Sequence, residues 1–292
     1  MTKPVAPRQA LSGETRLVGV MGDPVRHSLS PLIHAAAFEA LDLDWASAAF
    51  EVSPGHLGAA VAGIRALGIE GLSVTMPHKA TAAAAVDELA PSAAALGVVN
   101  CIARDGDRLI GHSTDGVGFV DAVSSGLGFD PAGHRCVILG AGGAARSIVA
   151  ALSEADASEV TVVNRTQSRA IETAALAGPT GRVGNAADIG AADLVVNTTS
   201  LGMADDRRLP CDPDLLREGQ VVVDIIYNPF ETPLLVAARE RGLRAQNGVP
   251  MLVHQAAEQI RIWTGTDAPI AAMLAATERF LTPAADQSGP PS

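Results

Sequence analysis

Short apolar runs rich in β-branched residues alternate with Ala- and Leu-rich stretches through the first part of the chain. The runs have the length of strands and the stretches the length of helices, which is typical of βαβ units in a mainly parallel sheet. We therefore predict an α/β fold. The predicted strands are 17–21, 45–52 and 71–76, and the predicted helices are 31–41, 57–67 and 80–89. We also predict a hairpin of strands 98–103 and 108–111, joined by an Asp105-Gly106-Asp107 turn.

A Gly- and Pro-rich interruption at 126–133 precedes a second series of the same kind. Its predicted strands are 135–139, 160–164, 193–197 and 220–226, its first helix is 144–153, and amphipathic helices follow at 251–263 and 268–280. We place a domain boundary at the interruption. The prediction is a first domain at 15–128, a second at 129–248, C-terminal helices at 249–282 that pack back on the first domain, and flexible Pro-rich tails at 1–14 and 283–292.

Composition and charge narrow the class of protein. The chain has 292 residues, is 48% hydrophobic and carries a formal net charge of −11, which speaks against nucleic-acid binding. A signal-peptide core and a long uncharged apolar stretch are both missing, so we expect a soluble, cytoplasmic protein without a membrane partner. Cys101, Cys136 and Cys211 are scattered, which fits neither a disulfide framework nor a zinc site, and we expect no metal.

A glycine-rich turn lies between the predicted strand 135–139 and the helix after it. In this Gly-x-Gly-x-x-Ala pattern, Gly140 allows a tight turn, Gly142 lets a pyrophosphate approach the backbone, and Ala145 allows close helix–strand packing. The helix N-terminus adds N–H groups for the phosphates. The alternative is a glycine-rich connection without a ligand. We predict a dinucleotide site at Gly140, Ala141, Gly142, Gly143 and Ala144.

The end of the next predicted strand indicates which dinucleotide binds. Asn164 follows Gly140 by 24 positions, where an NAD-binding unit places an acidic residue for the ribose. Here the segment runs through Asn164, Arg165 and Thr166, with Arg169 one helical turn further on. Arginine suits a 2′-phosphate through charge-assisted hydrogen bonds, so we predict NADP. The alternative for Arg165 is an exposed arginine at a helix start.

Lys79 is one of only two lysines in the chain, and the other, Lys3, lies in the N-terminal tail. A lysine can pass a proton, whereas arginine does not release one in a protein. Lys79 follows the predicted strand 71–76, which favours a role in chemistry. The alternative is a solvated surface lysine, the usual fate of this residue type.

Taken together, six segments resemble shikimate dehydrogenase in order and spacing, over Val18 to about Thr264. They are the glycine-rich turn and the segments 22–34, 73–79, 98–100, 113–116 and 247–256. The resemblance implies an N-terminal α/β substrate-binding catalytic domain and a Rossmann-type, doubly wound NADP-binding domain. It also implies NADP-linked reduction of 3-dehydroshikimate to shikimate, in chorismate and aromatic amino acid biosynthesis.

The resemblance assigns roles to individual residues. Lys79 and Asp115 are implied as the acid/base pair, in which a carboxylate keeps the amine charged and the ammonium stabilises a developing alkoxide. The implied substrate ligands are Ser28 and Ser30 for a carboxylate, Thr75, Asn100 and Gln255 for ring hydroxyls, and Tyr227 near the carboxylate. The implied contacts around the nicotinamide are Thr199, Ser200, Gly202 and Met203, and Gly248 also belongs to the cofactor site.

Several alternatives stay open. Ser30 before Pro31 and Asp115 before Gly116 are typical of helix caps, and Gln255 could face solvent. Ser73 and Ser113 stand where the family often has asparagine, which leaves quinate or an aminated shikimate analogue as possible substrates. A ligand-binding regulatory homologue without turnover is a different class of protein, and the intact Lys79 and Asp115 count against it. We expect a monomer or a homodimer.

Overall fold

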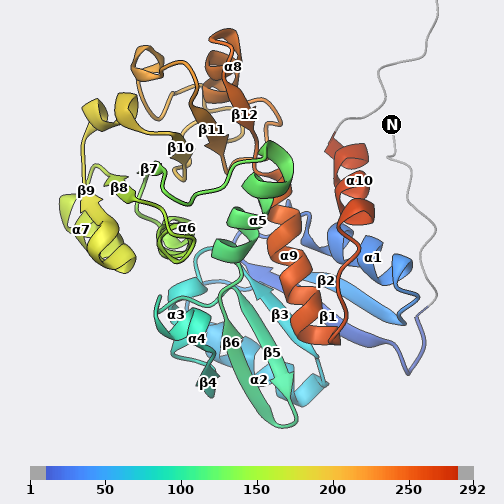
Figure 1. The fold of residues 1–292 in the computed structure, drawn as a ribbon. Coiled ribbons are helices and arrows are strands. Elements are labelled where there is room, and N and C mark those ends of the chain that lie inside the picture. The colour runs from blue at the N-terminus through green and yellow to red at the C-terminus, as the bar shows by residue number, and fades with distance from the viewer. Residues whose placement is uncertain (1–10, 282–292) are drawn as a thin grey trace, which may run out of the picture.

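Two six-stranded sheets form the centre of the molecule, one from each half of the chain (Figure 1). The computed structural model describes residues 11–281, so the predicted tails at 1–14 and 283–292 lie outside the described residues except for 11–14. Between residues 11 and 281, no helix is long and apolar enough to cross a bilayer. The two sheets confirm the α/β prediction.

The first sheet is mixed, with strand order β2-β1-β3-β5-β6-β4. The three strands predicted first pair in parallel, and the predicted hairpin is confirmed as an antiparallel pair whose turn has Gly106 at φ +60°. The connections between the parallel strands are helices, as a parallel sheet requires. The strands are β1 (Arg16–Gly22), β2 (Trp45–Glu51), β3 (Gly71–Val74), β4 (Glu88–Leu89), β5 (Cys101–Asp105) and β6 (Arg108–His112), and the helices are α1 (Ser30–Ala40), α2 (Leu57–Leu67), α3 (Lys79–Ala83) and α4 (Pro91–Ala94).

The predicted helix at 80–89 is wrong, because α3 ends at Ala83 and the chain returns to the sheet as β4. Asp87 is the reason. Its N–H donates to the carbonyl of Leu109, and its carboxylate accepts from the N–H of Leu109 at 2.7 Å. These bonds to β6 outweigh the helix propensity of the alanines, and Pro91 then keeps Ala90 extended.

The second sheet is wholly parallel, with strand order β12-β11-β10-β7-β8-β9. This order is that of a doubly wound Rossmann sheet, which confirms the predicted fold of this half. The edge strands β9 and β12 were not predicted, because three residues are too few to show a periodicity. The strands are β7 (Arg135–Leu139), β8 (Glu159–Val163), β9 (Gly181–Val183), β10 (Leu194–Asn197), β11 (Val221–Asp224) and β12 (Arg244–Gln246). The α-helices are α6 (Gly143–Glu154), α7 (Gln167–Ala174) and α8 (Pro233–Glu240), and 3₁₀ turns occupy Ala175–Thr180, Ala186–Ala191 and Pro213–Leu215.

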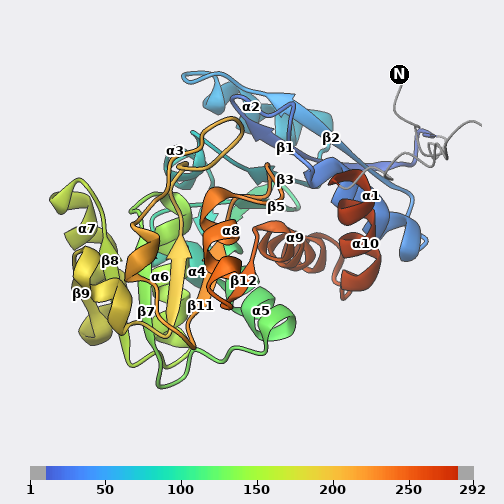
Figure 2. The ribbon, with the colours of Figure 1, turned by 90° about the horizontal axis from the view of Figure 1, so that it is seen from above.

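Helices α5 (Asp115–Leu127) and α9 (Val249–Thr264) lie where the two sheets meet, and α10 (Ile270–Leu281) packs beside α9 and α1. Helix α5 crosses both neighbours at glycines. A Cβ at Gly118 would lie 2.5 Å from the backbone nitrogen of Gln255 on α9, and a Cβ at Gly116 would lie 2.5 Å from the carbonyl oxygen of Ser147 on α6. Helices α9 and α10 lie beside α1 (Figure 2), so the end of the chain returns to the first sheet. The exact domain limits stay a prediction.

The core under these C-terminal helices contains a buried histidine. His34 on α1 is fully buried among apolar side chains, with Nδ1 2.8 Å from Ser47 Oγ and its ring edge-on to Trp263. Burial lowers the pKa of His34 from 6.5 to about 3, because the imidazolium would lose its hydration. The side chain is therefore neutral in the folded protein at physiological pH.

We expect this histidine to make the protein less stable in mild acid. Between pH 6.5 and about 3 the unfolded chain binds a proton at His34 and the folded chain does not. The free energy of unfolding should therefore fall as the pH falls, by at most about 1.4 kcal/mol per pH unit from this group. Urea unfolding of the parent protein and of His34→Gln, at several pH values from 7 to 4, measures that slope. Equal slopes in the two proteins would contradict the prediction.

Candidate active site

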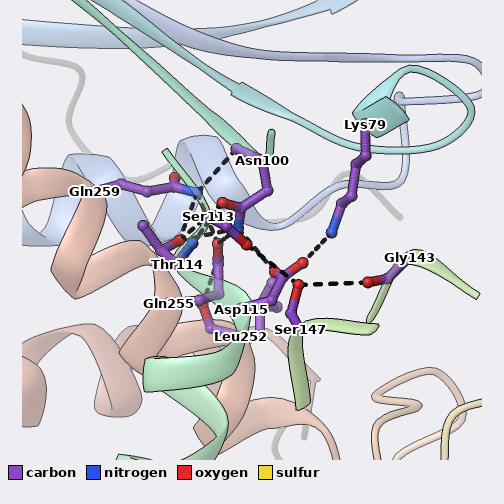
Figure 3. Close-up of polar contacts among 10 residues, drawn as sticks. All are labelled: Lys79, Asn100, Ser113, Thr114, Asp115, Gly143, Ser147, Leu252, Gln255 and Gln259. Atoms are coloured by element: carbon purple, nitrogen blue, oxygen red, sulfur yellow. Dashed lines mark hydrogen bonds and ion pairs between the residues drawn. The ribbon is translucent and has the colours of Figure 1, made fainter. Parts of the chain in front are cut away.

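Lys79 and Asp115 meet between the two sheets (Figure 3). Lys79 is the first residue of α3 and Asp115 the first of α5, and Lys79 Nζ donates to Asp115 Oδ2 at 2.5 Å. Their side chains are only 19% and 7% exposed, so Lys79 is not a solvated surface lysine. The carboxylate of Asp115 does not cap α5 either, because the N-cap residue is Thr114 and Asp115 is already the first residue of the helix.

Asn100 holds the other oxygen of the carboxylate. It lies just before β5, and its Nδ2 donates to Asp115 Oδ1 at 2.8 Å and to Thr114 Oγ1 at 2.9 Å. Its Oδ1 accepts from the backbone N–H of Thr114 at 2.7 Å. Both ends of the Asn100 amide are thus engaged, which fixes the direction of Asp115 towards Lys79.

Gln255 on α9 completes this group of polar side chains. It is buried rather than solvent-facing, with Oε1 3.4 Å from Asn100 Nδ2. Its neighbour Gln259, which the sequence analysis missed, donates from Nε2 to Gln255 Oε1 at 2.7 Å and to the carbonyl of Asn100 at 3.3 Å. Gln259 follows Gln255 by four positions, so helical periodicity alone would have placed the two amides on one face.

The glycine-rich turn of the second sheet lies against this group. Gly140 has φ +114°, and a Cβ there would lie 2.5 Å from Thr198 Oγ1, so only glycine fits. Gly142 is the N-cap of α6, and as a glycine it offers no side chain to cap this helix end. A Cβ at Gly143 would lie 3.6 Å from Lys79 Cδ, so the stem of the lysine runs past the start of α6. Ala141 and Ala144 flank these glycines.

A second contact joins the two halves through serine hydroxyls. Ser113 Oγ lies 3.2 Å from Ser147 Oγ on α6, and Ser147 Oγ also donates to the carbonyl of Gly143 at 3.4 Å. In the sequence, Ser113 is visible only as a departure from the family pattern, and nothing there distinguishes Ser147 from other helical serines. The structure gives the Ser113 hydroxyl a partner in the other half of the molecule.

The predicted 2′-phosphate residues follow β8. Asn164 Nδ2 donates to the carbonyl of Thr166 at 2.9 Å, which closes the turn, and Thr166 is the N-cap of α7. Arg165 and Arg169 are exposed, and neither forms an ion pair with any residue between 11 and 281. Two guanidinium groups at one strand end are therefore available to an anion.

The predicted carboxylate ligands lie at the start of α1. Ser28 Oγ donates to Ser30 Oγ at 3.2 Å and accepts from the backbone N–H of Ser30 at 3.3 Å. Ser30 is not the cap of α1, because the N-cap residue is Leu29. Thr75 lies after β3, with its Cγ2 2.4 Å from where a Cβ on Gly22 would be. Among the described residues, none of these side chains bonds directly to the Lys79 and Asp115 pair.

The remaining predicted residues lie after β10, β11 and β12. Thr199 Oγ1 donates to Asn197 Oδ1 at 2.7 Å, Gly202 has φ +94° and Met203 is 44% exposed. Ser200 accepts at its carbonyl from the N–H of Met203 at 3.2 Å.

Tyr227 is half-buried against the core that α1 and α9 share, and burial raises its pKa. Gly248, the N-cap of α9, packs so closely on Ile225 that a Cβ would lie 1.9 Å from the carbonyl oxygen. The turn after β11 thus reaches from the second sheet to the first.

The glycine-rich turn of the doubly wound sheet lies against a lysine–carboxylate pair from the other α/β unit. This combination is typical of a nucleotide-dependent oxidoreductase. Among residues 11–281, no group of three or more His, Cys, Asp or Glu side chains could hold a metal ion.

Family models match the chain at 20–102 for the shikimate dehydrogenase substrate binding domain, at 125–200 for shikimate / quinate 5-dehydrogenase, and at 248–278 for the shikimate 5'-dehydrogenase C-terminal domain.

Whole-chain similarities agree with these matches. A shikimate dehydrogenase (NADP(+)) of Moorella thermoacetica is 46% identical over 274 residues, which cover 90% of this chain and 92% of that protein. A solved shikimate dehydrogenase in complex with NADP+ superposes with a TM-score of 0.89 at 34% identity, over 95% of this chain and 100% of that one. The Thermus thermophilus enzyme in complex with NADP(H) and shikimate superposes with a TM-score of 0.85 at 36% identity, over 90% of this chain and 99% of that one. The chain belongs to the shikimate dehydrogenase family.

We expect the pair to be coupled in stability. Lys79→Met leaves Asp115 with Asn100 and the helix N-terminus as its only support, which should lower the free energy of unfolding by roughly 1–3 kcal/mol. Adding Asp115→Asn to that variant removes the unpaired charge and should recover at least half of the loss. Denaturant unfolding of the single and double variants measures the coupling.

The matched control is Arg26→Met, which removes an exposed ion pair with Glu51. Such a pair contributes at most about 1 kcal/mol, so this variant should unfold almost like the parent. Additive effects of Lys79→Met and Asp115→Asn would show that the two side chains do not support each other.

Proposed function

We propose that this protein is an NADP-dependent oxidoreductase that reduces 3-dehydroshikimate to shikimate, within chorismate and aromatic amino acid biosynthesis. The observation that carries the proposal is the buried Lys79–Asp115 pair beside the glycine-rich turn. It is supported by relatives named shikimate dehydrogenase (NADP(+)) that match nearly the whole chain. The resemblance seen in the sequence is confirmed.

The residues present fit the nicotinamide dinucleotide. The turn Gly140–Ala144 and the N-terminus of α6 would hold the pyrophosphate, and Arg165 with Arg169 would bind the 2′-phosphate beside Asn164 and Thr166. Thr199, Ser200, Gly202, Met203 and Gly248 would surround the nicotinamide. Bound NADPH supplies the hydride.

Lys79 acts on the oxygen of the substrate ketone. When the carbonyl carbon accepts the hydride and its electron pair, negative charge grows on that oxygen, and the Lys79 ammonium stabilises it and transfers a proton to it. The amine then regains a proton from solvent. Asp115, held by Asn100 at 2.8 Å, pairs with the amine and directs it at the ketone.

The substrate is a polyhydroxylated acid, and each unpaired polar group in a dry site costs about 1–3 kcal/mol. We assign its carboxylate to the hydroxyls of Ser28 and Ser30, with Tyr227 nearby, and its ring hydroxyls to Thr75, Asn100 and Gln255. Gln255 suits this role because Gln259 holds its oxygen and the carbonyl of Leu252 holds one of its N–H groups, at 2.8 Å. Its amide is therefore oriented before substrate binds.

Quinate or an aminated shikimate analogue is the alternative substrate, on the ground of Ser73 and Ser113, and a regulatory homologue without turnover is the alternative class. The engaged Lys79–Asp115 pair favours turnover. We also propose that the protein works in the cytoplasm, as a monomer or homodimer, without a nucleic-acid partner.

The test is an assay of purified protein with 3-dehydroshikimate and NADPH, followed by the absorbance of the reduced cofactor, beside quinate with NAD and with NADP. The proposal requires that 3-dehydroshikimate with NADPH is the preferred pair. Folded protein that binds these ligands without turnover would favour the regulatory alternative instead.

Lys79→Arg separates proton transfer from charge. The variant keeps a positive group near Asp115, but arginine does not release a proton, so kcat should fall about 10²- to 10⁴-fold while the protein stays folded. Steady-state kinetics with circular dichroism as the control for folding measure this. A kcat near that of the parent would assign Lys79 a purely electrostatic role.

Arg165→Ala tests the choice of cofactor. A hydrogen bond to a charged group contributes about 1.5–3 kcal/mol, so KM for NADPH should rise roughly 10- to 150-fold, whereas NADH, which has no 2′-phosphate, should be used as before. Adding Arg169→Ala should weaken NADPH further and non-additively if both arginines bind one phosphate. Equal losses with the two cofactors would place Arg165 in the fold or the adenine pocket.

A further inference from the structure

A buried carboxylate lies at the end of β11, outside the Lys79–Asp115 group. Asp224 is opposite Asn197, the last residue of β10, in the register of the parallel sheet, and both are 0% exposed. Within residues 11–281, Asp224 has no basic partner. Its hydrogen bonds come from three neutral donors, namely Asn197, the backbone of Ile226 and the hydroxyl of Thr232.

The bonds of Asp224 Oδ1 determine how Asn197 is oriented. This oxygen accepts from the backbone N–H of Ile226 at 3.1 Å and from Asn197 Nδ2 at 3.0 Å. Because a backbone N–H can only donate, Oδ1 is an acceptor, and Asn197 must present its amide nitrogen to it. With its nitrogen turned to Asp224, Asn197 must turn its oxygen to Thr199. There Oδ1 accepts from the backbone N–H at 3.0 Å and from Oγ1 at 2.7 Å.

The orientation of Asn197 also fixes the hydrogen bonds of Thr199 within its own turn. Since its hydroxyl proton is donated to Asn197, its Oγ1 is free to accept from the N–H of Leu201, at 3.1 Å. Asn197 Nδ2 also donates to the carbonyl of Leu201 at 3.3 Å. The turn that carries Thr199, Ser200, Gly202 and Met203 is therefore bonded, through one amide, to Asp224.

The same oxygen also holds the turn after β11. The N–H of Ile226 immediately precedes Tyr227, whose ring packs against the core shared by α1 and α9. The two turns are bonded to each other as well, because the N–H of Ala204 donates to the carbonyl of Asn228 at 2.9 Å. Asp224 Oδ1 therefore accepts from both sides, from Asn197 before the first turn and from Ile226 at the second.

We propose that Asp224 is a positioning residue for the reaction: its Oδ1 sets the cofactor-side turn at 199–203, through Asn197, and the substrate-side turn that carries Tyr227. This inference rests on the proposed function, since that function assigns the two turns to nicotinamide and substrate. Asp224 touches neither ligand and acts through Asn197 and the backbone of Ile226.

The chain offers a matched control at the other carboxylate oxygen. Among the described residues, Asp224 Oδ2 accepts only from Thr232 Oγ1, at 2.7 Å. Thr232 in turn caps α8 by accepting from the N–H of Leu235 at 3.4 Å. Neither bond leads to a ligand-side turn. Thr232→Val keeps the shape of the side chain, so it should destabilise the protein while leaving the binding of cofactor and substrate unchanged.

The experiment compares four full-length variants in kinetics, thermal unfolding and NADPH titration by cofactor fluorescence. Asp224→Ala should lose about 10²-fold in kcat/KM, with higher KM for both NADPH and 3-dehydroshikimate, because displaced groups no longer meet the reacting atoms. Asp224→Asn keeps an oxygen at the Oδ1 position and should recover most of that loss. Asn197→Ala should raise the Kd of NADPH about 10-fold, which is about 1.4 kcal/mol, and leave KM for 3-dehydroshikimate nearly unchanged.

The inference is overturned if Asn197→Ala binds NADPH like the parent, or if Asp224→Ala, when folded, shows the kinetics of Thr232→Val. If Asp224→Ala does not fold, the Kd of Asn197→Ala and the kinetics of Asp224→Asn decide alone. Failure of the proposed function looks different, because the parent protein itself would then be inactive with 3-dehydroshikimate and NADPH.

Discussion

The bond between Lys79 Nζ and Asp115 Oδ2 is the constraint on which the candidate active site depends. Its two residues begin different helices, and each helix leaves the first sheet for the seam between the halves. A short bond between two side chains of low exposure requires that both helix starts be placed to within a fraction of an ångström. The surrounding packing must therefore be rigid at this point, and the glycines of α5 show how it is made so.

Helix α5 has a neighbour on either side, and both approaches are closer than a methyl group would allow. Gly118 meets the backbone of Gln255, and Gly116 meets the carbonyl of Ser147. The first contact brings the amide of Gln255 to Asn100, and the second brings α6, with its glycine-rich N-terminus, to Lys79. One helix thus aligns the polar group with the nucleotide turn, although the side chains come from three separate parts of the chain.

Local signals explain what the sequence could predict. The strand, glycine turn and helix around Gly140 were predicted because each depends on residues next to one another, and so were the parallel strands and the hairpin. The helix predicted at 80–89 failed because Asp87 pairs with Leu109, a contact that no local pattern shows. Gln259, Ser147 and Asp224 were missed for a related reason. Amides, hydroxyls and single carboxylates are common throughout the chain, and only the fold shows which of them face a partner.

Two buried aspartates, Asp115 and Asp224, have different hydrogen-bond partners, and these partners suit the two carboxylates to different roles. Asp115 faces the only amine among residues 11–281, a group that can gain and lose a proton, so their bond can take part in a reaction. Asp224 faces only neutral donors, and although burial raises its pKa, three hydrogen bonds act in the opposite direction. Among residues 11–281, its hydrogen-bond partners are an amide, a backbone N–H and a hydroxyl, none of which changes charge. Such a carboxylate suits a group that orients its neighbours, whereas Asp115 faces a group whose charge can change.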